Sequence, residues 1–175
     1  MQQLTEQEKR AEVWAQEQTA YEYLQQALHA GWTATRTEGE FDDWDVTVTN
    51  NTTGKKVLVE NKIRNIDADY VRNEGAMVNV DKVERIQEQS LSAYIIQYFW
   101  RNNETYKWST DESDSWRKQE MWAKENSWTD RKVKKWRYLL PMDEEHRLWN
   151  VDLSDYTERY EYNYSIGLQL YAKGV

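Results

Sequence analysis

Residues 41–64 carry the sequence FDDWDVTVTNNTTGKKVLVENKIR. Apolar and polar residues alternate over 44–49 and again over 56–63, and a period of two is typical of β-strands with one buried face. Between them lies NNTTG (50–54), whose asparagine, threonine and glycine residues favour a tight turn. The segment therefore predicts two adjacent strands joined by a turn.

One face of the second strand is charged. Because successive side chains of a strand point to opposite faces, Glu60, Lys62 and Arg64 share one face, and apolar residues occupy the other. If the two strands pair, Asp45 of the first lies beside Glu60 and Lys62. Two carboxylates at close range repel each other unless a cation lies between them, so this arrangement suggests a bound cation.

A hard divalent cation such as Mg²⁺ prefers carboxylate and carbonyl oxygens and keeps several of its waters. Asp45, Glu60 and the backbone carbonyl of Asn61 are candidate ligands for one such ion. Lys62 is placed to orient or deprotonate a water, which would serve metal-assisted attack on a phosphodiester. The alternative is an ordinary exposed strand face with a surface Glu–Lys pair, which contributes little to stability.

Asp45 is followed, after fourteen intervening residues, by Glu60-Asn61-Lys62, and this combination resembles the signature of the PD-(D/E)XK nuclease superfamily, in particular its small phage-type members. The resemblance covers roughly residues 5–108 and departs from the usual pattern at Trp44, where a proline commonly precedes the aspartate. It implies a nuclease that uses Mg²⁺ or Mn²⁺, with Asp45, Glu60 and Lys62 as catalytic residues.

Residues 5–30 predict one long amphipathic helix. Thr5 followed by Glu8 has the spacing of a capping box, and Gly31 is a plausible stop. Glu17 lies within the apolar stripe of this helix, where an unpaired carboxylate would be costly to bury. The resemblance implies that such a first-helix glutamate reaches the metal, so Glu17 is a candidate catalytic residue and metal ligand. The alternative is a glutamate at the edge of the stripe that extends into water.

The rest of 5–109 alternates between strand and helix patterns. We expect a strand or connection at 32–40, a polar loop at 65–78, a helix at 81–91, a central strand at 92–100 and a further strand at 105–109. This order predicts an α/β fold with a mixed central β-sheet flanked by helices, a restriction-endonuclease-like core. Tyr70 and Arg72 in the polar loop are candidate phosphate contacts, and the resemblance makes Lys82 another.

Residues 110–175 are predicted to be a Trp- and Tyr-rich C-terminal extension of the same domain, so that 1–175 forms one domain. In 116–137, tryptophans alternate with basic residues. The tryptophan rings can stack on bases, and the basic side chains can neutralise phosphates. The other interpretation is a pair of amphipathic helices whose tryptophans pack on the sheet. The alternation in 138–175 predicts extra strands at a sheet edge. The candidate nucleic-acid contacts of the chain are Lys82, Arg64, Arg131, Lys132, Lys134, Lys135 and Trp128.

Charge and composition exclude several classes of protein. The net charge is −8, yet 116–137 carries eight basic residues against three acidic ones, which is compatible with DNA binding at one face of an acidic body. With no cysteine and only two histidines, disulfides, thiol chemistry and zinc fingers are excluded. No phosphate-binding glycine motif and no apolar run of membrane-spanning length occurs.

Two functions follow from these patterns. The first is a Mg²⁺- or Mn²⁺-dependent nuclease that hydrolyses DNA in the cytoplasm without membrane contact, and the sequence is compatible with a homodimer. The second is a nuclease-fold protein without activity that binds or inhibits a host protein, because an acidic surface can dock onto nucleic-acid-binding proteins.

Overall fold

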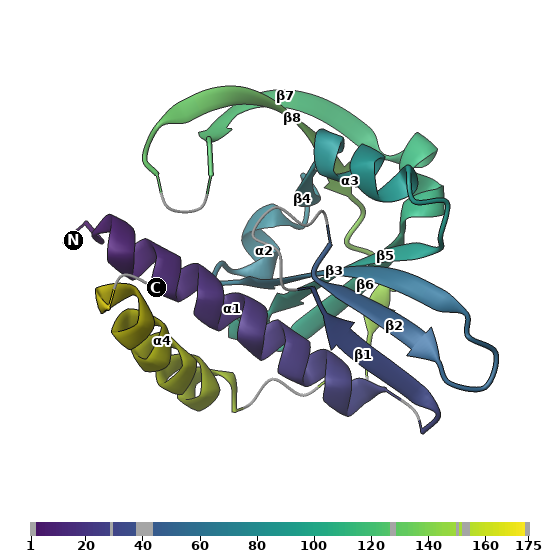
Figure 1. Cartoon of the computed structure of the whole chain (residues 1–175). Coiled ribbons are helices and arrows are strands. Elements are labelled where there is room, and N and C mark those ends of the chain that lie inside the picture. The colour runs from purple at the N-terminus through teal and green to yellow at the C-terminus, as the bar shows by residue number, and fades with distance from the viewer. Residues whose placement is uncertain are drawn as a thin grey trace.

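The strands β3 (Lys56–Arg64) and β5 (Ala93–Phe99) lie side by side as the parallel pair at the centre of the main sheet. The computed structural model describes residues 3–28, 30–37, 44–126, 129–149, 151 and 155–173. Within these residues the sheet has six strands in the order β1-β2-β3-β5-β6-β9, and its other neighbours are antiparallel (Figure 1). The outer strands are β1 (Trp32–Arg36), β2 (Val46–Asn50), β6 (Glu104–Ser109) and β9 (Arg147–Leu148).

The helix α1 (Glu6–Ala27) covers one face of this sheet. Its predicted capping box is confirmed: the Glu8 amide donates to Thr5 Oγ1 (3.1 Å) and the Thr5 amide donates to the Glu8 carboxylate (2.9 Å). Ala20 and Leu24 of α1 pack with the apolar residues of β2, β3 and β5. The helix therefore fixes Glu17 at the level of the two central strands.

The helix α4 (Tyr156–Ala172) lies alongside α1 (Figure 1). A Cβ on Gly167 would come within 3.1 Å of the Ala11 Cα, so the missing side chain allows the two helix backbones to approach closely. Buried Asn163 donates to the Thr19 hydroxyl at 3.1 Å. This contact satisfies two polar groups inside the helix pair.

The prediction of extra strands in 138–175 is wrong after β9. Tyr156, Tyr160 and Tyr164 recur every four residues, which places them on one side of a helix. Their rings stack in sequence, with centroids 5.4 and 6.0 Å apart. The strand preference of tyrosine concealed this helical spacing in the sequence.

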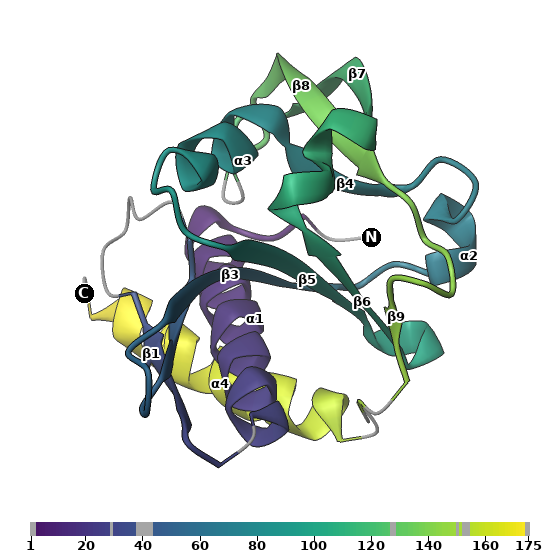
Figure 2. The ribbon, with the colours of Figure 1, turned by 90° about the vertical axis from the view of Figure 1, so that its right-hand side faces the viewer.

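A second layer lies over the opposite face of the main sheet (Figure 2). Its three-stranded sheet has the order β4-β8-β7 and is formed by β4 (Ala76–Asn79), β8 (Lys132–Leu140) and β7 (Arg117–Lys124). The helices α2 (Ala68–Val71) and α3 (Val80–Gln87) and the 3₁₀ helix η2 (Thr110–Ser115) belong to this layer, and η1 (Trp100–Asn102) joins β5 to β6. Buried Trp108, Tyr106 and Phe99 of the main sheet pack against it.

The predicted mixed sheet flanked by helices is confirmed, and so is the element order of the core. The strand β4 is an addition, because three of its four residues (76–78) lie in the segment predicted to be a loop. The helical interpretation of 116–137 is wrong, since this segment contains the antiparallel hairpin of β7 and β8. None of the described helices combines the length and the apolar character needed to cross a bilayer.

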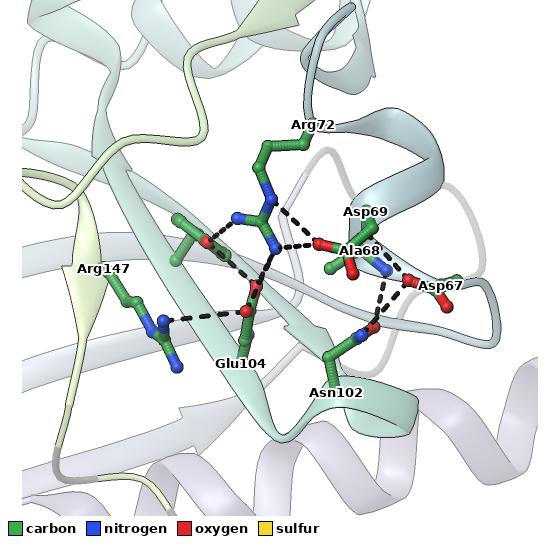
Figure 3. Close-up of polar contacts among 8 residues, drawn as sticks. Asp67, Ala68, Asp69, Arg72, Asn102, Glu104 and Arg147 are labelled. Carbon is green, nitrogen blue, oxygen red and sulfur yellow. Dashed lines mark hydrogen bonds and ion pairs between the residues drawn. The ribbon is translucent and has the colours of Figure 1, made fainter.

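Arg72 is not free to contact phosphate, in contrast to its interpretation from the sequence. Its guanidinium donates to both carboxylate oxygens of Glu104 (3.0 and 3.1 Å), to Asp69 (2.8 Å) and to the Tyr106 hydroxyl (2.9 Å) (Figure 3). Tyr106 in turn donates to Glu104 (2.9 Å), and Arg147 lies 3.6 Å from the same carboxylate. The network ties α2 to β6 and β9, and its role is structural.

We expect Arg72→Met to lower the free energy of unfolding by about 2 kcal/mol, because it leaves the Glu104 side chain, only 11 % exposed, without its main charged donor. The matched control is Arg117→Met, which removes an ion pair of similar length, 2.8 Å, between exposed Arg117 and Glu74. That variant should change stability by less than about 0.5 kcal/mol. Urea unfolding measures both, and equal effects would contradict the assignment.

Candidate active site

The register of β2 and β3 brings Asp45 next to Glu60. Val46 pairs with Val59 as the last pair of the β2–β3 ladder, and the Asp45 amide also donates to the Val59 carbonyl at 3.1 Å, so Asp45 lies beside β3 just outside the regular ladder. The Asp45 carboxylate accepts a hydrogen bond from the Asn61 amide at 2.8 Å. Asp45 therefore lies just before β2, next to the Glu60–Asn61 segment of β3.

Glu60 is a nearly buried carboxylate, and only one of its two oxygens has a partner among the described residues. Its Oε1 lies 2.5 Å from Lys82 Nζ of α3, and its side chain is 12 % exposed. Within the described part of the chain, the buried Oε2 has no hydrogen-bond partner. Burial and the nearby Asp45 carboxylate raise the pKa of Glu60 to about 8, although Lys82 acts in the opposite direction. The charge of Lys82 therefore does not compensate the two carboxylates fully.

Lys62 and Glu17 complete the group. Lys62 shares the face of Glu60 on β3, and among the described residues its Nζ makes no hydrogen bond or ion pair. Burial, followed by the charge of Arg64, lowers the pKa of Lys62. Burial and then the Asp45 carboxylate raise the pKa of Glu17, while Lys62 and Arg36 oppose them. The structure therefore brings all four predicted catalytic side chains into one electrostatic neighbourhood.

Two of these four residues, Glu60 and Lys62, border a cleft of about 540 Å³ between the main sheet and the second layer. Its floor includes Glu60, Lys62 and Arg64 of β3, and Lys82 lines one side. The cleft is also lined by Met77, Val78, Asn79, Ile95, Gln97, Lys124, Glu125, Asn126, Lys135 and Arg137. Six lining residues are basic and two are acidic, so the cleft is positive although the whole chain carries −8. Such a cleft attracts polyanions.

The basic residues are close enough to repel one another. Burial and then the charge of Arg137 lower the pKa of Arg64 to about 10, although Arg64 donates to the Met77 carbonyl (2.7 Å) and to Gln97 (3.1 Å). Burial and Arg137 also lower the pKa of Lys135. The Arg137 Nε is buried without a partner among the described residues. A cluster of this kind costs stability and favours binding of an anion.

The predicted nucleic-acid contacts are distributed over different surfaces. Arg64, Lys82 and Lys135 line the cleft. The chain also places Lys124 and Arg137 there, two residues that were not predicted. Arg137 could have been found from the sequence, because it lies two positions after Lys135 and a strand repeats its faces with a period of two.

Lys134 lies on the other face of the hairpin, 3.8 Å from Glu120 and over the ring of Trp122. Arg131 and Lys132 are exposed near the hairpin turn, and Arg131 lies 3.7 Å from Glu125. The structure does not bring these three residues together with Glu60. Trp128 lies outside the described residues.

A second group of candidate ligands lies away from the cleft, where Asp143, Glu145 and His146 have ligand atoms within 4.8 Å of one another. Both ring nitrogens of His146 are already engaged, Nδ1 with Asp143 (2.5 Å) and Nε2 with Glu112 (2.7 Å). A metal needs a free nitrogen lone pair, which these contacts occupy. The group is therefore a charged bridge between η2 and the turn before β9.

No family model and no curated protein sequence matches the chain. Among solved structures, it is similar to the Holliday junction resolvase Hjc of the archaeal hyperthermophile Archaeoglobus fulgidus, with a TM-score of 0.35 and 16 % sequence identity. The match covers 66 % of this chain and 80 % of that one. A likeness at this TM-score does not decide the function, so the functional inference rests on the residues of the cleft.

His146 should make the stability of the chain depend on pH. Burial lowers the pKa of His146, but the hydrogen bonds to Glu112 and Asp143 outweigh it and raise the pKa. The bridge therefore contributes fully below the unfolded pKa of about 6.5 and is lost as the pH rises through the raised value. In urea unfolding, the advantage of wild type over His146→Gln should be larger at about pH 6 than at about pH 9. A constant advantage would contradict this role.

Proposed function

We propose that this chain is a divalent-metal-dependent nuclease of the PD-(D/E)XK superfamily that hydrolyses phosphodiester bonds in DNA. The observation that supports it most is the pair of adjacent carboxylates, Asp45 and Glu60, with one buried Glu60 oxygen lacking a partner and Lys62 on the same strand face. An ordinary exposed strand face would not leave Glu60 only 12 % exposed.

The residues present fit a divalent cation. In the part of the chain that the structure describes, no donor reaches Glu60 Oε2, and burial followed by the nearby Asp45 charge raises the pKa of Glu60. Asp45, Glu60 and the Asn61 carbonyl would hold Mg²⁺ or Mn²⁺, with Glu17 as a further oxygen donor. When bound, such an ion activates a water and stabilises charge on the phosphate.

Lys62 is the candidate for proton transfer at the attacking water. Its lowered pKa means that the neutral amine at Nζ is reached more easily than in an ordinary lysine. That amine would accept a proton from the water as its oxygen attacks phosphorus and the opposite P–O bond breaks. Geometry supports this role, because Lys62 is two residues beyond Glu60 and makes no contact with other described groups that would occupy it.

Lys82 and Arg64 have different tasks in this proposal. Lys82 contacts Glu60 directly at 2.5 Å and orients that carboxylate. Arg64 is fixed by Gln97 and the Met77 carbonyl, so its guanidinium presents positive charge to the cleft in a defined position. Charges that are fixed before the substrate binds stabilise the additional negative charge of the transition state with little reorganisation.

We expect purified wild type to cleave single- or double-stranded DNA with Mg²⁺ or Mn²⁺ and to lose activity in EDTA. Glu60→Gln and Lys62→Met should each reduce the rate by about 10²-fold or more, because one removes a metal ligand and the other the proton acceptor. The matched control is Lys56→Met, an exposed lysine on the same face of β3 that does not line the cleft. It should retain full activity.

Two outcomes would contradict the nuclease. One is the absence of cleavage of any DNA with either metal. The other is cleavage that survives Glu60→Gln, since a contaminating nuclease would then be responsible. Tight binding of a protein partner that is unaffected by Lys62→Met, without any cleavage, would favour the second function considered from the sequence.

A further inference from the structure

The hairpin of β7 and β8, here called the arm, extends from the second layer toward the beginning of α1 (Figure 1). Its residues Lys124, Lys135 and Arg137 line the cleft. Its base is anchored in the core, where buried Trp116 and Tyr138 meet edge to face with centroids 5.4 Å apart. Further along, the arm has little cover: Trp122 and Trp136 are 65 % and 54 % exposed. The base of the arm is thus buried in the core, whereas the tryptophans further along it are exposed to solvent.

The far end of the arm contacts the beginning of α1. The Asp130 carboxylate accepts from Lys9 Nζ at 2.6 Å through one oxygen and from the Gln3 amide at 2.5 Å through the other. Lys9 is only 8 % exposed, whereas the Asp130 side chain is 51 % exposed. The Lys9–Asp130 pair, here called the closing contact, joins two segments that are 121 residues apart in the sequence.

The closing contact completes a ring of elements around the cleft. α1 packs on β3, β3 pairs with β5, and the arm rises from β4 and α3 on the other side. The cleft is lined from below by Lys62 and Arg64 of β3, and by Lys124, Lys135 and Arg137 of the arm from the opposite side. Positive charge therefore faces the cleft from both walls.

We propose that the arm encloses one single strand of DNA against the candidate active site, and that the Lys9–Asp130 contact opens to admit the strand and closes behind it. The identity of the ligand rests on the proposed nuclease function. The enclosure itself rests on the ring of elements and on the position of the basic residues.

The size and charge of the cleft favour a single strand. A volume of about 540 Å³ is within the range of sites that hold one small ligand, and far less than a duplex occupies. Basic residues on two facing walls neutralise one phosphate backbone from both sides. In the described part of the chain, the buried Nε of Arg137 on the arm is a donor without an acceptor.

The closing contact is of a kind that can open. A pair in which one member is half exposed is weak and screened by salt, unlike the buried base of the arm at Trp116 and Tyr138. The arm consists of a two-stranded ladder over most of its length, since β7 pairs with β8 alone. Among the described residues, opening breaks the contacts of Asp130 with Lys9 and Gln3 and leaves the buried base of the arm intact.

A cross-linking experiment tests enclosure without relying on cleavage. The chain has no cysteine, so Lys9→Cys and Asp130→Cys introduce the two thiols needed for a short bis-maleimide reagent. Glu60→Gln is added so that the DNA stays intact. Cross-linking after mixing with circular single-stranded DNA should leave protein on the circles at about 1 M salt, where purely electrostatic binding is lost. Linear single strands should release the protein under the same conditions.

Order of addition provides the control. Protein that is cross-linked before mixing should not remain on circles at high salt, while still binding linear strands at low salt. Each single-cysteine variant treated with the same reagent should behave like unmodified protein. Two results would overturn the enclosure. One is that the protein is not retained on circles in either order of addition, and the other is that retention is equal in both orders.

A second variant covers the case in which the cysteine substitutions disturb binding. Asp130→Ala removes the closing contact without adding a thiol, and it should release circular single strands at least several-fold faster than wild type. Equal release rates would overturn the role of the contact. If the active protein cleaves DNA but shows no retention, the enclosure fails and the nuclease stands. If the protein is retained on circles but never cleaves DNA, the enclosure stands and the nuclease fails.

Discussion

The repulsion between Asp45 and Glu60 is the constraint on which the rest of the site depends. The β2–β3 register places the two carboxylates together, and burial denies them the water that would otherwise screen them. The result is a raised pKa for Glu60 and a Glu60 oxygen that no donor among the described residues reaches. A fold selected for stability alone would avoid this pair, because an uncompensated buried charge is among the most destabilising features of a protein.

The surrounding elements can be understood as responses to this pair. Lys82 of α3 reaches the Glu60 carboxylate from one layer, and α1 brings Glu17 with Arg36 beside it from the other. The arm then adds Lys135 and Arg137 to the cleft, which is positive in an acidic chain. After burial, the charge of Arg137 lowers the pKa of both Arg64 and Lys135. Local order comes from ordinary devices, such as the capping box of α1 and the Arg72 network.

The sequence predicted those strands in which apolar and polar side chains alternate with the two-residue period of β-structure. The alternation from Asp45 to Arg64 gave the two strands, their faces and the meeting of the acidic residues. The arm and α4 were not predicted, because tryptophan, tyrosine and lysine occur in both strands and helices. Their placement also depends on contacts between segments: Trp116 packs against Tyr138 in the arm, and Gly167 of α4 packs against Ala11 of α1. The closing contact between Lys9 and Asp130 has no local signal in the sequence at all.

The most direct test of this account is the position of Mn²⁺ in crystals of the protein, located from its anomalous scattering. The account predicts an ion between Asp45 and Glu60 that contacts the partnerless Glu60 oxygen and is absent from Glu60→Gln crystals grown in the same way. A clear map with no ion at these carboxylates, or with Mn²⁺ bound only by Asp143, Glu145 and His146, would contradict it.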